Sequence, residues 1–367
     1  MIKNLNILIC PLEWGLGHAT RMIPLARRLI EMKGNILIGC GKEHQALFSK
    51  ELPGLAFIDF PGFRPSYSGY FPQYLILLIK TPVLVYHTIV EHIRLKKIIR
   101  KYSINIVISD NRFGLWNRDV VTVYVTHMPR IPFPKHFTFL EFIGILMHRA
   151  IIRKYDYCYI PDLPGSLNVS GRLSHGIRLP DNVRYIGLLS RFSSVSQDKG
   201  PNPFAFRHNT VILSGPEPQR EILKQKLAEI LKDREPITVF LEGRPGIGNE
   251  MRRSGNIVFY NHLDSPGMMD AVSSGETIIT RAGYTTIMEL ISMKCSAILI
   301  PTPGQTEQEY LGRYLAGKGW FRSVLQKEIA GELLSNQLND CPAEEMISQS
   351  RILLDNAMNE LSGNYQH

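Results

Sequence analysis

The stretch TRAGYTTIMELISMKCSAILIPTPGQTEQEY, from Thr280 to Tyr310, contains two strand-to-helix turns in succession. An apolar run at 277–279 leads to a turn at Gly283, and apolar side chains then recur at helical spacing. A second apolar run at 297–300 is followed by prolines, a glycine and a polar helix start. In open parallel sheets, ligands bind at the carboxyl ends of the strands, where helix N-termini offer unpaired N–H groups to anions. The stretch therefore predicts a binding site for an anionic ligand.

The same stretch resembles the donor-nucleotide site of the family-28 glycosyltransferases, which include the N-acetylglucosaminyltransferase of peptidoglycan synthesis. The shared pattern is an Arg, a small residue and a Gly, a Glu six residues later, then a strand, a Pro and a Gln-rich helix start. The resemblance implies that the turn at Gly283 approaches a diphosphate, that Glu289 binds the ribose hydroxyls and that Gln308 contacts the sugar. Glu309 stands where the family often has a second glutamine. An ordinary turn followed by a surface Glu is the alternative explanation.

Two earlier loops extend the resemblance. Residues 214–220 follow an expected strand at 209–213 and correspond to a glycine loop that closes on the donor, in a more proline-rich form. Residues 261–266 correspond to a loop that lies against the base, where the backbone of Leu263 would read uracil. The donor-binding residues that the resemblance implies are Gly17, Ser214, Gly215, Arg220, Leu263, Arg281, Gly283, Tyr284, Thr285, Glu289, Gln305, Gln308 and Glu309.

A glycine-containing turn also follows the first expected strand, Leu5–Cys10. An amphipathic helix is expected after this turn, from about Thr20 to Met32. Pro24 is acceptable in the first turn of a helix, where its missing N–H costs little. Thr20 is therefore expected to be the N-cap of this helix.

The residues Gly15-Leu16-Gly17-His18 in this turn resemble the first glycine loop of the same family. A His beside a helix N-terminus is kept neutral by the helix dipole, so it is available as a base near pH 7. Two later strands are expected to end at Asp110 and His127, on the sheet edge that carries His18. In related two-domain glycosyltransferases an Asp orients such a His, and we expect a catalytic His18–Asp110 pair with His127 nearby. A structural histidine and a capping Asp are the alternatives.

The size and composition suit two soluble domains. The chain has 367 residues, of which 44% are hydrophobic and 20% charged. This is enough apolar material for two hydrophobic cores. Strands and helices alternate in both halves, and a segment rich in Gly, Ser and Pro separates them. With the resemblance, we predict an α/β protein of the GT-B type with two Rossmann-like domains facing a cleft. An acceptor-binding domain is expected at 1–187, a linker at 188–208 and a nucleotide-sugar-binding domain at 209–367.

Cysteine usage and the N-terminus indicate a cytoplasmic protein. The five cysteines are scattered without metal-ligand spacing, which is typical of reduced core residues. The apolar residues 1–10 end at Pro11 and are more like a first strand than a secretion signal.

The net charge of +9 is concentrated in the first half. Residues 1–189 carry 24 Lys and Arg against 12 Asp and Glu, whereas residues 190–367 carry 18 against 21. Two apolar segments in the basic half, 74–101 and 136–154, end in clusters of Lys and Arg. They are either core helices with solvated basic ends or a surface that rests on the anionic inner face of a membrane.

Together these features predict inverting transfer of a hexose or N-acetylhexosamine from a UDP-sugar to an acceptor hydroxyl. The apolar segments favour a lipid-linked acceptor. His18 would be the base, and helix N-termini with Arg281 would stabilise the leaving diphosphate, so neither a metal nor a cofactor is expected. A nucleotide-sugar hydrolase or epimerase on the same fold is the alternative. A nucleic-acid-binding protein is disfavoured, because the basic residues do not form a recognisable nucleic-acid-binding motif.

Overall fold

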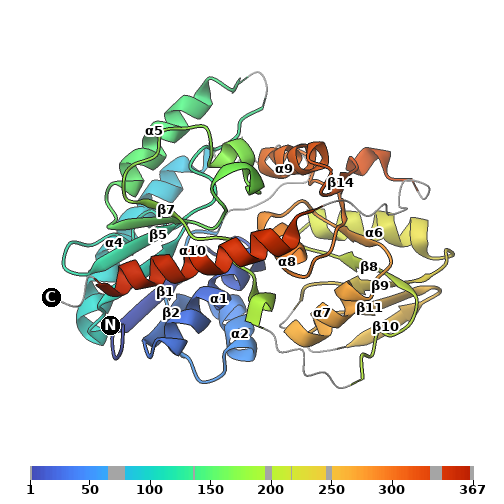
Figure 1. Ribbon diagram of the computed structural model, residues 1–367, viewed down its shortest axis with the longest axis horizontal. Helices are drawn as coiled ribbons and strands as arrows, with labels where there is room; N and C mark the ends of the chain where they lie inside the picture. Colours follow the sequence, from blue (N-terminus) through green and yellow to red (C-terminus); the bar gives the residue numbers. More distant parts are fainter. Residues whose placement is uncertain are drawn as a thin grey trace.

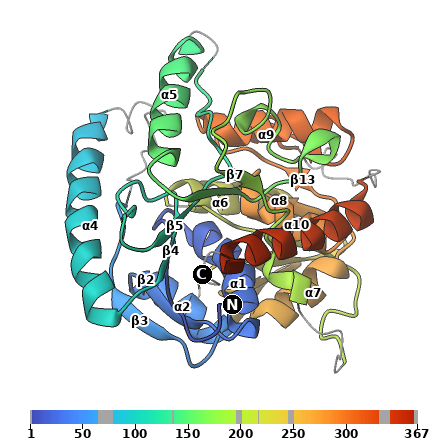
Figure 2. The same ribbon diagram turned by 60° about the vertical axis from the view of Figure 1, so that its left-hand side comes forward.

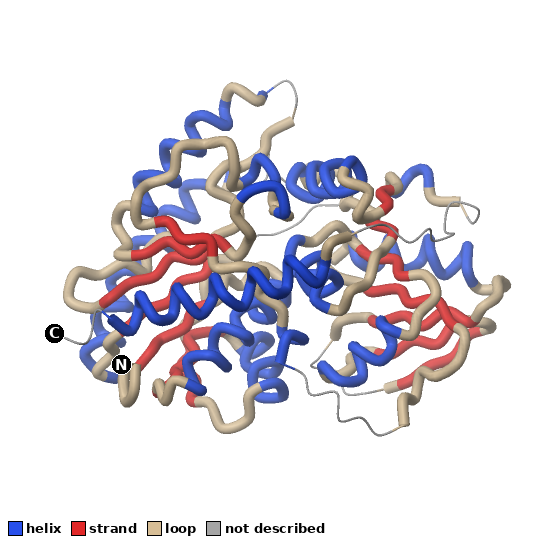
Figure 3. Tube along the Cα trace, viewed as in Figure 1, coloured by secondary structure: helices blue, strands red, loops and turns tan. Residues whose placement is uncertain are grey.

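The computed structural model describes residues 2–64, 79–134, 137–194, 201–215, 217–244, 250–330 and 341–363. It contains two sheets of seven strands, which lie in separate halves of the molecule (Figures 1 and 3). In spatial order the first sheet, entirely parallel, consists of β3 (Ala56–Asp59), β2 (Asn35–Cys40), β1 (Asn6–Cys10), β4 (Ile106–Asp110), β5 (Val121–Val125), β6 (Tyr157–Ile160) and β7 (Val183–Tyr185). The second consists of β10 (Met251–Ser254), β11 (Ile257–Tyr260), β9 (Ile237–Leu241), β8 (His208–Ile212), β12 (Ile278–Thr280), β13 (Ile298–Leu299) and β14 (Arg322–Ser323), with only β10 antiparallel.

The helices connect these strands in the order that parallel sheets require. Those of the first half are α1 (Leu16–Glu31), α2 (Lys42–Glu51), α4 (Thr81–Tyr102) and α5 (Leu140–Ile152). Those of the second half are α6 (Gln219–Leu231), α7 (Ser265–Ser273), α8 (Tyr284–Ser292), α9 (Thr306–Gly317) and α10 (Ala343–Gly363). Short 3₁₀ helices are η2 (Gly165–Leu167), η3 (Gly171–Leu173), η4 (Arg191–Ser194) and η5 (Gln326–Glu328).

The strand order reverses at β1 and β4 in the first sheet, and at β8 and β12 in the second. A crevice forms at such a point because the connections leave the two neighbouring strands toward opposite faces of the sheet. The α/β architecture with two parallel sheets is the one that the sequence predicts. The sequence does not predict β7, β10 or β14, which are edge strands of two to four residues with little hydrophobic pattern.

The side chains of the central strands alternate between the two faces of each sheet, and both faces are buried. Ile7 and Ile9 of β1 join the core beneath α1, whereas Leu8 packs with Leu95 of α4 on the opposite face. The core beneath α1 is continuous with apolar residues of α8, including Ile287. Each fully buried Leu or Ile contributes roughly 1.5–3 kcal/mol. The two halves are therefore joined through an apolar contact as well as through polar ones.

The last helix, α10, belongs to the second half in sequence but packs along the first half (Figure 1, red). The Tyr159 hydroxyl donates to the carbonyl of Ala357 at 3.1 Å, and Arg184 forms an ion pair of 2.8 Å with Glu360. The domain limits at 187 and 209 stay a prediction, and residues 195–200 of the expected linker lie outside the described residues.

Helix α1 corrects one prediction. It begins at Leu16, four residues before the expected start, so Thr20 is not the N-cap and Pro24 lies in the helix interior. Gly15 makes the earlier start feasible, because its φ of +75° lies in the left-handed region that favours glycine. The Thr20 hydroxyl instead donates to the carbonyl of Gly17 at 3.1 Å. The earlier start places His18 in the first turn of the helix.

Candidate active site

The structure brings His18 and Asp110 together at the strand reversal of the first sheet. His18 lies in the first turn of α1, directly after β1, and Asp110 is the last residue of the neighbouring strand β4. The Nδ1 atom of His18 is 2.8 Å from Oδ2 of Asp110. The Asp110 side chain is completely buried, whereas the His18 side chain keeps 15% of its surface exposed. The pair is thus a buried carboxylate beneath a partly accessible imidazole.

A buried arginine, Arg21, links this pair to His127. Its Nε donates to Asp110 Oδ2 at 3.1 Å, and its Nη2 donates to Oδ1 of the same carboxylate. Its Nη1 lies 3.0 Å from His127 Nδ1, and its Nη2 lies 2.8 Å from His18 Nδ1. Arg21 is not among the residues predicted from the sequence, although its spacing of three residues from His18 would put both on one helix face.

These neighbours set the protonation of the site. Burial and the positive charge of Arg21 lower the pKa of His18 to about 4, and they outweigh the opposite effect of Asp110. Burial opposes ionisation of Asp110, but Arg21 and His18 overcome it and lower the pKa of this carboxyl to about 2. At neutral pH the site therefore holds a neutral imidazole beside an ionised carboxylate, which is suited to accepting a proton.

The second half of the molecule completes this site. Glu307, in the first turn of α9, places Oε1 2.7 Å from His127 Nε2. The ring of Tyr284, the first residue of α8, stacks on the His127 ring with centroids 4.2 Å apart. The Thr285 hydroxyl donates to the carbonyl of Gly17 at 3.0 Å. Gly17, Tyr284 and Thr285, all expected to bind the donor, therefore lie where the two halves meet.

Glu289 is buried in α8 and faces the first half. Its Oε1 lies 3.0 Å from Nε of Arg191 in η4, and Arg191 also approaches Glu51 of α2 at 3.5 Å. Burial raises the pKa of Glu289 even though the charge of Arg191 opposes this. Arg191 is not among the residues predicted from the sequence, because it falls in a segment whose composition is typical of a linker.

Arg281, whose guanidinium was expected to stabilise a leaving diphosphate, has a completely buried side chain. Its Nη1 donates to Gln326 Oε1 at 2.7 Å and its Nη2 donates to the carbonyl of Gln219 at 2.8 Å. Burial lowers its pKa to about 10. These acceptors hold the guanidinium between the start of α6 and η5, and its role toward a diphosphate stays a prediction.

The residues expected at the second turn shape the loop before α9. Gln308 Oε1 accepts from the N–H of Thr302 at 2.9 Å, and Glu309 Oε1 accepts from the N–H of Gly304 at 2.9 Å. Gln305 is the N-cap position of α9 and makes no capping bond with its side chain. These contacts hold the loop backbone in place at the carboxyl end of β13.

The remaining expected donor residues lie around the carboxyl ends of the second sheet. Gly283 is the N-cap of α8 with φ of −78°, which any residue can adopt, whereas Gly215 has φ of +92°. Ser214 and Gly215 follow β8, and Arg220 of α6 is held by Glu217 at 2.7 Å. Leu263 is half-buried and packs against the main core before α7.

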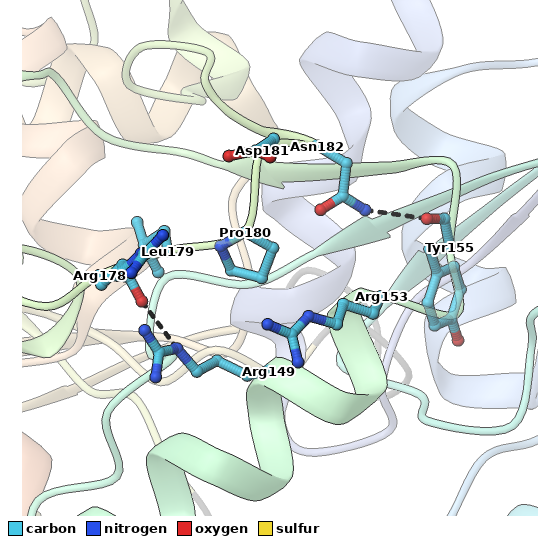
Figure 4. Close-up of a pocket in the computed structure, with 8 residues that line it drawn as sticks. All are labelled: Arg149, Arg153, Tyr155, Arg178, Leu179, Pro180, Asp181 and Asn182. Carbon is cyan, nitrogen blue, oxygen red and sulfur yellow. Dashed lines mark hydrogen bonds between the residues drawn. The ribbon is translucent and has the colours of Figure 1, made fainter.

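A separate hollow of about 360 Å³ lies on the first half, at the amino ends of β6 and β7 (Figure 4). Arg149 and Arg153 at the end of α5 line it together with Arg178, and Nε of Arg149 donates to the Arg178 carbonyl at 2.7 Å. It opens at the sheet edge opposite to the one where Asp110 lies. This hollow is therefore not part of the His18 site.

Comparison with known proteins locates the chain among glycosyltransferases. Residues 249–359 match the glycosyltransferase family 28 C-terminal domain. The UDP-N-acetylglucosamine–N-acetylmuramyl-(pentapeptide) pyrophosphoryl-undecaprenol N-acetylglucosamine transferase of Thermodesulfovibrio yellowstonii is 35% identical over 74 residues, which is 20% of each chain. The transferase of the same name from Pasteurella multocida is 25% identical over 174 residues, 45% of this chain and 48% of that one. The matched stretches thus span at most about half the length of these relatives.

Solved structures show the same fold over nearly the whole chain. The glycosyltransferase SnogD from Streptomyces nogalater has a TM-score of 0.61 at 13% identity, with 96% of each chain covered. MurG of Acinetobacter baumannii has a TM-score of 0.51 at 12% identity, with 98% of this chain and 99% of that chain covered. The chain therefore has the GT-B fold, and its residues 249–359 match the glycosyltransferase family 28 C-terminal domain.

Proposed function

We propose that this protein is an inverting glycosyltransferase that moves a hexose or N-acetylhexosamine from a UDP-sugar to an acceptor hydroxyl. The observation that carries the proposal is the neutral His18 imidazole, held by Asp110 at the meeting point of the two halves. The family 28 match of residues 249–359 and the relatives that use UDP-N-acetylglucosamine support a nucleotide-sugar donor.

His18 would act as the general base. With its Nδ1–H donated to Asp110, the Nε2 lone pair is free to remove the proton of the acceptor hydroxyl. The acceptor oxygen then attacks the anomeric carbon, and the bond from that carbon to the phosphate oxygen breaks with its electron pair leaving on the UDP. Because this is a single displacement, the anomeric configuration inverts. Asp110 stabilises the imidazolium that forms.

The second half would hold the donor. Helices α8 and α9 begin directly after β12 and β13, so their N-terminal N–H groups and positive dipole ends lie beside the site. These fixed dipoles would stabilise the leaving diphosphate without a metal. Retention of activity in EDTA is the expected result. Glu289 would exchange its contact with Arg191 for the ribose hydroxyls when the donor enters.

The surface of the first half supports an acceptor in a lipid layer. Both α4 and α5 lie at the periphery of the first half (Figures 1 and 2). Their exposed apolar side chains include Val83, Tyr86, Ile89 and Ile93 on α4 and Phe142, Ile143, Leu146 and Met147 on α5. The described part of the chain contains no helix with the length and apolarity needed to cross a membrane.

We propose that this face rests on the anionic inner surface of a membrane. The apolar side chains would enter the interface, and Arg and Lys at the ends of α4 and α5 would face the headgroups. The names of the curated relatives specify a pyrophosphoryl-undecaprenol acceptor, which agrees with a lipid-linked acceptor here. The protein would then act in the cytoplasm as a peripheral membrane enzyme of the cell envelope. Residues 74–78 of the first apolar segment lie outside the described residues.

The test is a thermal-shift panel of nucleoside diphosphates and nucleotide sugars, followed by product analysis. A ligand at 100 times its Kd adds about 2.7 kcal/mol of stability, so uridine compounds should raise the Tm above that with adenosine or guanosine compounds. Transfer should require an added acceptor. Release of free sugar without acceptor would favour the hydrolase alternative, and no response to any nucleotide would refute the proposal.

A further inference from the structure

His127 lies in the first half, but the second half surrounds it. The Tyr284 ring stacks on one face of the imidazole, and Glu307 meets its Nε2 at 2.7 Å. On the other side, Arg21 Nη1 lies 3.0 Å from its Nδ1. The His127 side chain is buried, and the Glu307 side chain keeps only 19% of its surface exposed. The pair is therefore a polar contact in the interior of the molecule, between the two halves.

The hydrogen-bond partners determine the tautomer of His127. A guanidinium only donates, so Nδ1 of His127 must accept from Arg21 Nη1 through its lone pair. The proton of the neutral ring is then on Nε2, where it is donated to the ionised Glu307 carboxylate. Burial opposes ionisation of Glu307, but His127, His18 and Arg21 overcome it and lower the pKa of this carboxyl.

The same arginine decides the state of His18. Its Nδ1 lies 2.8 Å from both Asp110 Oδ2 and Arg21 Nη2. If it donates to Asp110, Nε2 is a base; if it accepts from Arg21, Nε2 carries the proton and cannot act as one. The position of the guanidinium between Asp110 and His127 therefore determines whether His18 Nε2 can act as a base.

The charges of the cluster can balance the cation that His18 becomes when it accepts a proton. Arg21 contributes one positive charge, and Asp110 and Glu307 contribute one negative charge each, so the cluster has one negative charge in excess. Proton uptake by His18 neutralises it. Without Glu307, the same uptake would leave an uncompensated positive charge in a buried site, which is costly.

From this geometry we propose that Glu307 is a positioning residue that activates His18 when the two halves close. It holds His127 in the Nε2–H form, His127 in turn holds Arg21 Nη1, and the carboxylate balances the charge that His18 gains. Contact with the second half thereby enables His18 in the first half to act as a base. The inference rests on the proposed transferase function.

The kinetic test compares Glu307→Gln with Thr306→Val. Gln still accepts from His127 Nε2 but lacks the charge, whereas the Thr306 hydroxyl bridges the halves to the Pro132 carbonyl at 2.8 Å without touching either histidine. Glu307→Gln should lower kcat roughly tenfold and Glu307→Ala about a hundredfold, as parts of the ~10²- to 10⁴-fold that a positioned base supplies. KM for the donor should change little. Thr306→Val should instead raise KM for the donor. Equal changes in kcat and KM for the Glu307 and Thr306 variants would overturn the proposal.

A second measurement does not depend on catalysis. In ¹⁵N spectra of the histidine rings, assigned with a His127→Gln variant, His127 should be neutral with its proton on Nε2. Glu307→Ala should alter this signal and that of His18, whereas Thr306→Val should leave both in place. A His127 ring that is cationic, or protonated only on Nδ1, overturns the inference. If no nucleotide binds in the thermal-shift panel, the proposed function is refuted. The histidine ring spectra still test whether Glu307 controls the state of His127 and His18.

Discussion

The substitution Asp110→Asn tests the site most directly. Asp110 is completely buried and accepts hydrogen bonds from Arg21 Nε and Nη2, with His18 Nδ1 at 2.8 Å. Asn keeps the shape but removes the charge, so the buried Arg21 loses its counterion. Removing one partner of a buried ion pair costs about 3–5 kcal/mol of unfolding free energy. Arg21 would then become the partner of His18 Nδ1, which places the proton on Nε2 and disables the base.

We therefore expect turnover to fall by roughly 10⁴-fold, the loss found when the carboxylate of such a pair is replaced by an amide in a serine protease. The stability effect should also depend on pH. The pKa of Asp110 is lowered from 3.8 to about 2, which corresponds to about 2 kcal/mol. Because the folded-state pKa is the lower one, this contribution is present above pH ~4 and is lost as the pH falls toward 2. The difference between parent and variant should therefore shrink in acid.

The assay is urea unfolding followed by tryptophan fluorescence, at pH 7 and at pH 3, beside turnover at pH 7. Asp59→Asn is the matched control, because Asp59 also ends a strand of the same sheet but is exposed, and its change should stay within ~0.5 kcal/mol. The double variant Asp110→Asn with Arg21→Met should lose less stability than the sum of the single variants. Parent-like turnover and parent-like stability in Asp110→Asn would refute the assigned roles.

Four further outcomes follow from the site and the surface. His18→Gln should keep nucleotide binding in a thermal-shift assay but lower turnover by ~10²- to 10⁴-fold; loss of binding would contradict its role as base. Glu289→Ala should weaken nucleotide binding measured by calorimetry by about 1.5–3 kcal/mol, and unchanged affinity would remove it from the ribose site. Because the pKa of His18 is lowered to about 4, turnover should be flat from pH 6 to 8 and should fall only as the pH approaches 4, where the base becomes protonated; a midpoint near 6.5 would be inconsistent with this burial. Phe142→Glu with Ile143→Glu on α5 should reduce sedimentation with anionic vesicles, whereas Ile352→Glu on α10, equally exposed and apolar, should not; equal effects would indicate nonspecific binding.

The parts of the site that the sequence predicts are those that follow from local pattern and sheet topology. Asp110 ends an apolar strand, and His18 follows the first one in a glycine turn, so the parallel order places them on one edge. The turns at Gly283 and Gln305 likewise follow apolar strands directly. Because strand periodicity and strand ends depend on neighbouring residues, the chain alone contains this information.

Contacts that depend on burial could not be predicted from the sequence in the same way. Arg281 matches a family motif, yet in the folded chain it donates to Gln326 and Gln219 inside the second half. The partners of Arg281 come from segments that local sequence pattern does not relate to it. Pro24 was expected in a first turn but lies inside α1, because the helix begins earlier, after Gly15.

The sequence by itself determined two parallel α/β halves, the strand ends that carry the candidate site, and the basic, apolar character of the first half. Only the tertiary structure decided how the halves meet. Arg21 becomes the centre of the site because Asp110, His18 and His127 surround it, and Glu307 reaches His127 across 180 residues of chain. Such contacts arise from the packing of two halves that are far apart in the sequence, and packing of this kind leaves no periodic signal in a sequence.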